Sequence, residues 1–246
     1  MPYAEHDGHR IFYTVRGSGP VMVLLHGHLL SSACWQDGGF AQTLADGYTV
    51  VLIDALGHGH SDKPSASDAY QLAHRANGVV AVLDAIGAES FHLVGHSMGG
   101  WTAVGLARAI PGRLLSLTLG GWNPVQGIAA GLPPGVQGPI PFTKALSVAR
   151  STAPELVSWV TAENEPGLRA SWETMDDLDG AVEALLECEC PVLLWSGRAD
   201  PRGMSMQALA AQYGWRMLWT EGDHLTVVIR HGTENALLVR QAIEKR

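Results

Sequence analysis

Short apolar runs alternate along this chain with longer amphipathic stretches, and the alternation predicts the fold. The runs have strand length and high aliphatic content, and several are apolar throughout, which is typical of a parallel sheet covered on both faces. They span Arg10–Val15, Val21–His26, Tyr48–Asp54, Phe91–Val94, Leu114–Leu119, Pro191–Ser196 and Arg216–Thr220.

Between these runs the apolar positions recur with a helical period. The clearest case is Leu72–Ile86, where they form one stripe of the expected helix. We expect further helices at Ala33–Ala45, Gly99–Ile110, Met204–Gln212 and Thr233–Lys245. Strands that alternate with helices in this way predict an α/β protein with a mostly parallel, doubly wound sheet flanked by helices.

One long segment interrupts the alternation. From Gly121 to about Glu187 there is no strand pattern, and the segment opens with prolines before it becomes helical. An unstructured loop of this length is improbable in a compact domain. We therefore expect residues 122–186 to form a helical cap over a core domain made of residues 1–121 and 187–246. The prolines are Pro124, Pro133, Pro134, Pro139 and Pro141.

Composition narrows the functional classes. With 246 residues, 46% of them hydrophobic, the chain has enough apolar surface for one large core. The 16 basic and 24 acidic residues give a net charge of -8, which disfavours nucleic acid or an anionic membrane as a partner. The first residues lack the apolar core of a signal peptide, and Val21–Leu25 is far too short to span a membrane. These features predict a cytoplasmic protein. They leave its oligomeric state open, with a monomer and a homodimer both possible.

The cysteines indicate reduced thiols. Cys34, Cys188 and Cys190 are odd in number, and the last two are too close in sequence for an unstrained disulfide. We interpret all three as packing residues.

The strongest chemical signal is the hexapeptide Gly95-His96-Ser97-Met98-Gly99-Gly100. It follows one apolar run and opens a helix, which is the setting of a Gly-x-Ser-x-Gly nucleophile elbow. Such a turn brings neighbouring chain close, so small residues are needed two positions before and after the serine, as Gly95 and Gly99 provide. The turn also places Ser97 at a helix N-terminus, where free N–H groups favour negative charge.

A serine hydroxyl needs a base to take its proton, and the base needs a third group to orient it. Asp200 follows the strand Pro191–Ser196, and His224 follows the strand Arg216–Thr220, at the sheet edge where catalytic groups collect. We therefore predict Ser97 as nucleophile, His224 as general base and Asp200 as its orienting acid.

Other residues fit these roles less well. Asp54 precedes Ser97, whereas in elbow-type hydrolases the acid and the base follow the serine. Asp223 is better suited to closing the turn that presents His224. His231 is the other histidine after Asp200 and starts the last helix.

The loop after the strand Val21–Leu25 supplies the remaining requirement, an oxyanion hole. We predict that the backbone N–H groups of His28 and Met98 form it. His26-Gly27-His28 and His58-Gly59-His60 resemble metal-ligand pairs, but no carboxylate spacing completes either set. We expect neither a metal nor another cofactor.

Together these motifs resemble the α/β-hydrolase superfamily from end to end. The resemblance rests on His26-Gly27, the loop Asp54–Pro64, the elbow at Ser97, the turn Gly197–Asp200 and Gly222-Asp223-His224. It is strongest to the small serine esterases, enol-lactonases, cofactor-free haloperoxidases and carbon–carbon bond hydrolases. It implies an α/β-hydrolase fold with a small cap inserted after the sixth strand. The chain departs from some relatives in carrying Ser97 where dehalogenases and epoxide hydrolases carry aspartate, and Leu56 where an arginine is usual.

The resemblance implies a serine hydrolase that cleaves a small to medium, largely apolar carboxylic ester or lactone through an acyl-enzyme on Ser97. We expect an apolar substrate pocket. Its candidate lining residues are Trp35, Trp122, Trp159 and Trp172.

Other functions of the same fold stay open. A carbon–carbon bond hydrolase would need a basic residue for a substrate carboxylate, for which Arg150, Arg169 and Arg198 are candidates. A haloperoxidase-type perhydrolase would use the same triad. A ligand sensor without turnover is the alternative outside the enzymes.

Overall fold

The computed structural model describes residues 2–132 and 140–245, and its centre is one eight-stranded sheet. The strand order is β1-β2-β4-β3-β5-β6-β7-β8. Strands β3 to β8 run parallel to one another, whereas β2 is antiparallel to both β1 and β4. The strands are β1 Tyr3–His6, β2 His9–Arg16, β3 Val21–Leu25, β4 Thr49–Ile53, β5 Phe91–His96, β6 Leu114–Gly120, β7 Val192–Gly197 and β8 Arg216–Thr220.

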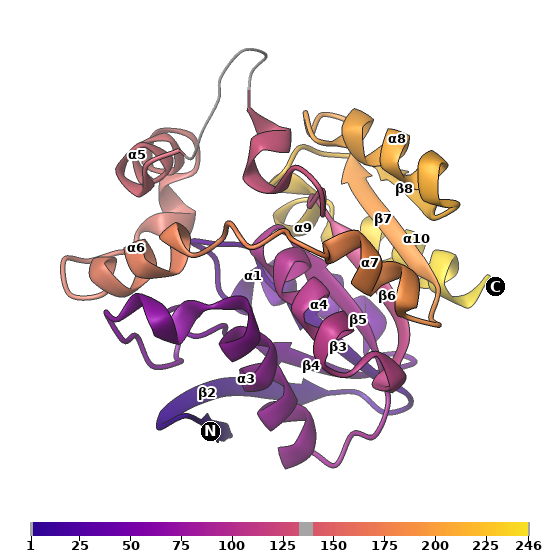
Figure 1. Cartoon of the computed structure of the whole chain (residues 1–246), viewed down its shortest axis with the longest axis horizontal. Helices are drawn as coiled ribbons and strands as arrows, with labels where there is room; N and C mark the ends of the chain where they lie inside the picture. Colours follow the sequence, from indigo (N-terminus) through magenta and orange to yellow (C-terminus); the bar gives the residue numbers. More distant parts are fainter. Residues whose placement is uncertain (1, 133–139, 246) are drawn as a thin grey trace.

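The period of two along each strand sends alternate side chains into two separate cores. On β3, Val23 and Leu25 join the core beneath α3, α4, α7 and α8, while Met22 and Leu24 face α1, α2, α9 and α10. Figure 1 shows helices both in front of and behind the sheet. Both faces of the central strands are therefore buried, which accounts for their uninterrupted apolar sequence.

The helices agree with the predicted pattern, with two exceptions. The expected helix Ala33–Ala45 is two helices, because Gly38 packs so tightly that an added Cβ would lie 2.0 Å from the Val228 carbonyl oxygen, and Gly39 has φ 76°. The short helix α9 was not predicted. The helices are α1 Ala33–Asp37, α2 Phe40–Leu44, α3 Leu72–Ala85, α4 Met98–Ala109, α5 Phe142–Thr152, α6 Glu165–Glu173, α7 Ala181–Glu187, α8 Gly203–Tyr213, α9 Thr226–Ile229 and α10 Gly232–Glu244.

The segment between β6 and β7 contains α5, α6 and α7, and its described residues include no strand. Helices α5 and α6 lie apart from the helices that cover the sheet (Figure 1). Their apolar residues form a cluster with Leu29, whereas Ala181, Ala184 and Leu185 of α7 belong to the main core. A cap of residues 122–186 stays a prediction, and Pro133, Pro134 and Pro139 lie outside the described residues.

Candidate active site

The turn between β5 and α4 places Ser97 at the carboxyl edge of the sheet. Its backbone has φ 55° and ψ -116°, a combination that is strained for any residue with a side chain. An added Cβ at Gly95 would lie 2.2 Å from the Gly99 carbonyl oxygen, and one at Gly99 would lie 2.1 Å from the Leu25 carbonyl oxygen. Both positions therefore require glycine, as the elbow motif predicted.

Two hydrogen bonds connect the three predicted triad residues. The Oγ of Ser97 lies 3.0 Å from Nε2 of His224, and Nδ1 of His224 donates to Oδ2 of Asp200 at 2.7 Å. Asp200 is buried, while Ser97 and His224 are partly accessible from outside. The arrangement suits proton transfer from a hydroxyl to an imidazole whose tautomer is fixed by a carboxylate.

Arg202 holds the other oxygen of Asp200. Its backbone N–H donates to Oδ1 at 3.0 Å, and its Nη1 donates to the same atom at 3.2 Å. With Oδ1 occupied, Oδ2 is the oxygen that faces His224. Arg202 was not predicted as a site residue, although its position two residues after Asp200 allows its side chain to turn back onto the carboxylate.

Burial and nearby charges shift the pKa values of His224 and Asp200. Burial lowers the pKa of His224, the positive charge of Arg202 lowers it further, and Asp200 opposes both effects only in part. Burial alone would raise the pKa of Asp200, but the hydrogen bond from His224 and the guanidinium of Arg202 hold it well below its usual range. Near neutral pH the carboxylate is therefore ionised and the imidazole neutral, so Nε2 is free to accept a proton.

The competing carboxylates have other tasks. Oδ1 of Asp223 accepts the backbone N–H groups of Leu225 and Thr226, at 2.9 and 2.8 Å, and so closes the turn that carries His224, as predicted. Asp54 accepts the N–H groups of Ser32 and His60, at 2.7 and 2.8 Å, and ties two loops together.

The loop after β3 lies directly against the nucleophile. An added Cβ on Gly27 would come within 3.2 Å of the Cβ of Ser97, so the neighbouring His28 backbone is close to the site. Met98 is the first residue of α4, and a helix leaves such N–H groups without an acceptor of its own. The predicted oxyanion donors therefore belong to chain segments that border Ser97.

Two of the paired histidines, His26 and His58, make hydrogen bonds within their loops, and His26 also connects the two loops. His26 donates from Nδ1 to the Gly27 carbonyl and accepts the N–H of Ala55 on Nε2, at 2.8 and 3.0 Å. Nδ1 of His58 donates to the Leu56 carbonyl at 3.1 Å. Burial lowers the pKa of both His26 and His58, so both rings are neutral.

The His28 side chain reaches α6. Its Nε2 donates to the Leu168 carbonyl at 3.0 Å, and its ring packs edge-on against Trp172. Burial, with Arg75 nearby, lowers the pKa of His28 to about 3, so the ring is neutral. His28 also lines the cavity described next.

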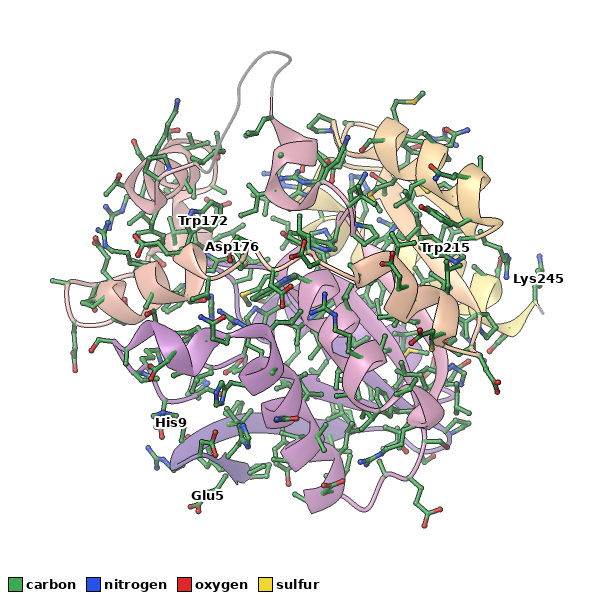
Figure 2. The ribbon with its side chains drawn as sticks, in the orientation of Figure 1. Glu5, His9, Trp172, Asp176, Trp215 and Lys245 are labelled. Carbon is green, nitrogen blue, oxygen red and sulfur yellow. The ribbon has the colours of Figure 1, made fainter. Side chains whose placement is uncertain are left out.

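A cavity of about 340 Å³ opens onto Ser97 and His224. Most of its lining is aliphatic or aromatic, and Lys144 and Arg202 are its basic side chains within the described residues. Trp122 and Trp172 line it, the latter from α6 (Figure 2).

The other two predicted tryptophans do not line this cavity. Trp35 is fully buried and packs against Phe40, and the Nε1 of Trp159 donates to the Leu29 carbonyl at 3.1 Å. Arg150, Arg169 and Arg198, the sequence candidates for a substrate carboxylate, are also absent from its described lining. Arg169 pairs with Glu165 instead, and Arg198 pairs with Glu221.

Comparison with known proteins identifies the fold. A family model described as the alpha/beta hydrolase fold matches residues 20–138. The crystal structure of the enol-lactonase from Burkholderia xenovorans superposes with a TM-score of 0.78 at 21% identity, over 99% of this chain and 100% of that one. This chain has the α/β-hydrolase fold, and its likenesses lie in that superfamily.

Relatives with closer sequences match only about half of this chain or less. An uncharacterized protein of Mycobacterium tuberculosis is 39% identical over 124 residues, which are 49% of this chain and 35% of that protein. A pimeloyl-[acyl-carrier protein] methyl ester esterase of Methylococcus capsulatus is 39% identical over 109 residues, which are 44% of this chain and 39% of the esterase. This chain thus spans less than half the length of these curated relatives.

Within residues 2–132 and 140–245, none of the helices combines the length and the apolar character needed to span a bilayer.

Proposed function

We propose that this chain is a serine hydrolase that cleaves a carboxylic ester or lactone through an acyl-enzyme on Ser97. The observation that carries the proposal is the hydrogen-bonded series Ser97, His224 and Asp200 at the mouth of an apolar cavity. The relatives support hydrolysis in general, since they include an esterase by name, and an enol-lactonase shares the fold.

The geometry suggests the following reaction. Ser97 Oγ attacks the carbonyl carbon while Nε2 of His224 takes the hydroxyl proton, and ionised Asp200 stabilises the imidazolium. The N–H groups of His28 and Met98 donate to the oxyanion. The intermediate collapses, the C–O bond of the leaving group breaks, and His224 returns the proton to the departing alcohol. Water then attacks the acyl-enzyme by the same route, which releases the acid and restores Ser97.

The cavity favours an uncharged substrate of modest size. Its lining includes Trp122, Trp172, Leu29 and Ile128, which offer apolar surface to an acyl or alkyl group. Arg202 already serves Asp200, which leaves the exposed Lys144 as the one basic side chain of the described lining that could meet a substrate carboxylate. This is why an ester or lactone ranks above the acid-bearing substrates of a carbon–carbon bond hydrolase.

A panel of short and long p-nitrophenyl esters and simple lactones tests this proposal. We expect steady turnover over many cycles, whereas a ligand sensor would bind such compounds without sustained product release. Because Trp172 lines the cavity, Trp172→Ala should change the ratio of kcat/KM between long and short acyl chains by about 10-fold.

Trp159→Ala is the matched control, since this indole packs in the cap segment outside the cavity. Its ratio should stay at the wild-type value, and a ratio is independent of how much protein is folded. An equal change in both variants, or in neither, would place the acyl-binding surface elsewhere.

The pH dependence of kcat/KM tests the role assigned to His224. The base must be neutral, and its pKa lies below the ordinary value of about 6.5, so activity should persist below that pH before it falls. The positive charge of Arg202 contributes to this lowering. Arg202→Gln should therefore raise the pKa of His224 and move the acid limb of the profile to higher pH.

Arg202→Lys is the control for this prediction, because it keeps a positive charge while both variants keep the backbone N–H that holds Asp200. Its acid limb should stay closer to that of the wild type. Acid limbs that coincide in all three proteins would show that Arg202 does not act on the base.

A further inference from the structure

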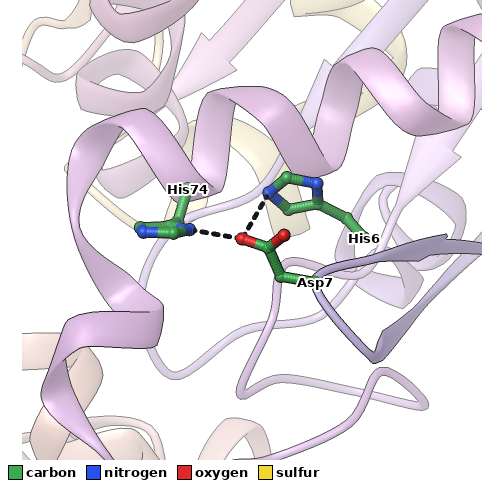
Figure 3. A group of neighbouring side chains, drawn as sticks. All are labelled: His6, Asp7 and His74. Carbon is green, nitrogen blue, oxygen red and sulfur yellow. Dashed lines mark ion pairs between the residues drawn. The ribbon is translucent and has the colours of Figure 1, made fainter.

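A second group of chemically active side chains lies apart from Ser97. The turn of the β1–β2 hairpin carries His6 and Asp7, and α3 brings His74 beside them (Figure 3). All three border a cavity of about 390 Å³ whose lining, within the described residues, includes neither Ser97 nor His224.

The donor atoms of these side chains converge. Oδ2 of Asp7 lies 2.9 Å from Nδ1 of His74 and 3.5 Å from Nε2 of His6, and all three atoms lie within 4.8 Å of one another. Ligands of a tetrahedral zinc ion, bound at about 2.0 Å, are about 3.3 Å apart. The three donors therefore need to move only slightly to share one ion.

The hairpin fixes the carboxylate in this position. Asp7 and Gly8 have φ 48° and φ 75°, the left-handed pair typical of a two-residue turn, and His6 pairs with His9 across it. Aspartate tolerates such a backbone better than most residues. The turn thus presents Asp7 toward α3 in a set orientation.

His6 supplies an independent sign that a ligand belongs here. Its Nε2 is shielded from solvent and has no hydrogen-bond partner among the described residues, and only the longer contact to Asp7 reaches it. A buried imidazole nitrogen without a partner is unfavourable. The attraction between Asp7 and His74 does not explain why the three side chains converge. These two side chains are 58% and 45% exposed, and exposed ion pairs contribute little to stability.

We propose that His6, Asp7 and His74 bind a divalent transition-metal ion such as Zn²⁺. Two imidazoles and one carboxylate form a donor set that these ions prefer over Ca²⁺ or Mg²⁺. Bound there, the ion joins the N-terminal hairpin to α3 and keeps a coordination position open. The ion can bind at this site only in the folded chain, since His74 is far from His6 in sequence.

Zinc titration of the full chain after treatment with a chelator tests this site. Cys188 and Cys190, whose sulfur atoms lie 2.8 Å apart, are replaced by serine in every protein because thiols also bind zinc. We expect calorimetry to show one zinc ion per chain. The melting temperature should rise by about 5–10 °C at 100 times the Kd.

Variants separate this site from zinc bound elsewhere. His74→Gln and Asp7→Asn should each lose the calorimetric signal and the rise in melting temperature. Glu5→Gln, on the same strand but exposed and pointing outward (Figure 2), should keep both. Circular dichroism of the zinc-free proteins checks that all are folded. Equal zinc binding by His74→Gln and its parent, or no binding by the parent, would overturn the proposal.

Discussion

Asp200→Asn is expected to lower kcat by about four orders of magnitude, because the asparagine favours the wrong tautomer of His224. In the wild type, Oδ2 accepts the Nδ1 proton, which leaves Nε2 free to take the proton of Ser97. An amide NH₂ in place of Oδ2 would donate toward Nδ1, and Nε2 would then carry the proton. The fold should survive, since the remaining amide oxygen still accepts the Arg202 N–H.

Steady-state kinetics with the best ester of the panel measures this effect, alongside the melting temperature of each protein. Asp223→Asn is the matched control, because it removes a carboxylate next to His224 while its amide oxygen can still accept the Leu225 and Thr226 N–H groups. That variant should keep kcat within about 10-fold of the wild type. A near wild-type rate for Asp200→Asn would transfer the acid role to another carboxylate, with Asp54 the next candidate.

The sheet was predictable from the sequence because its central strands are buried on both faces. Each of the expected strands is present. An uninterrupted aliphatic run such as Val21–Leu25 is favoured where both faces of a strand are buried, as they are in the centre of a parallel sheet. The strand Tyr3–His6 was missed because only Ala4 in it is buried. The Asp7-Gly8 pair, a common hairpin signal, could have revealed it.

The helices show where sequence patterns stop being sufficient. The stretch Ala33–Ala45 has a continuous apolar stripe, yet it breaks where Gly38 meets Val228, almost two hundred residues away. Contacts of this kind depend on the packed structure and leave no local signal.

The candidate catalytic residues were predictable because each sits in a local motif with a defined place on the sheet. Ser97 lies in a turn that only glycines at Gly95 and Gly99 permit, and Asp200 and His224 each follow a strand. Sorting the tryptophans required the structure, because tryptophan suits a core as well as a pocket. The group of His6, Asp7 and His74 was missed because His74 comes beside the hairpin only when separate segments fold together. Arg202 is only two residues from Asp200, but the structure was needed to show that its side chain turns back onto the carboxylate.

The nucleophile assignment predicts the largest effect of all. Ser97→Ala should lower kcat by about six orders of magnitude, because no other hydroxyl lies within hydrogen-bond reach of Nε2 of His224 in the described residues. The residual rate would reflect binding and oxyanion stabilisation alone. The melting temperature should change little, since the side chain is small and partly exposed.

Labelling with a fluorophosphonate tests the central claim most directly, because it needs no knowledge of the natural substrate. An activated serine attacks phosphorus, displaces fluoride and forms an adduct that resembles the tetrahedral intermediate. We predict one equivalent of label per chain, located on Ser97 by peptide mapping, and slower labelling in His224→Ala. Labelling should also weaken as the pH falls below the lowered pKa of His224. Folded wild-type protein that stays unlabelled at Ser97 would contradict the assignment of a serine hydrolase.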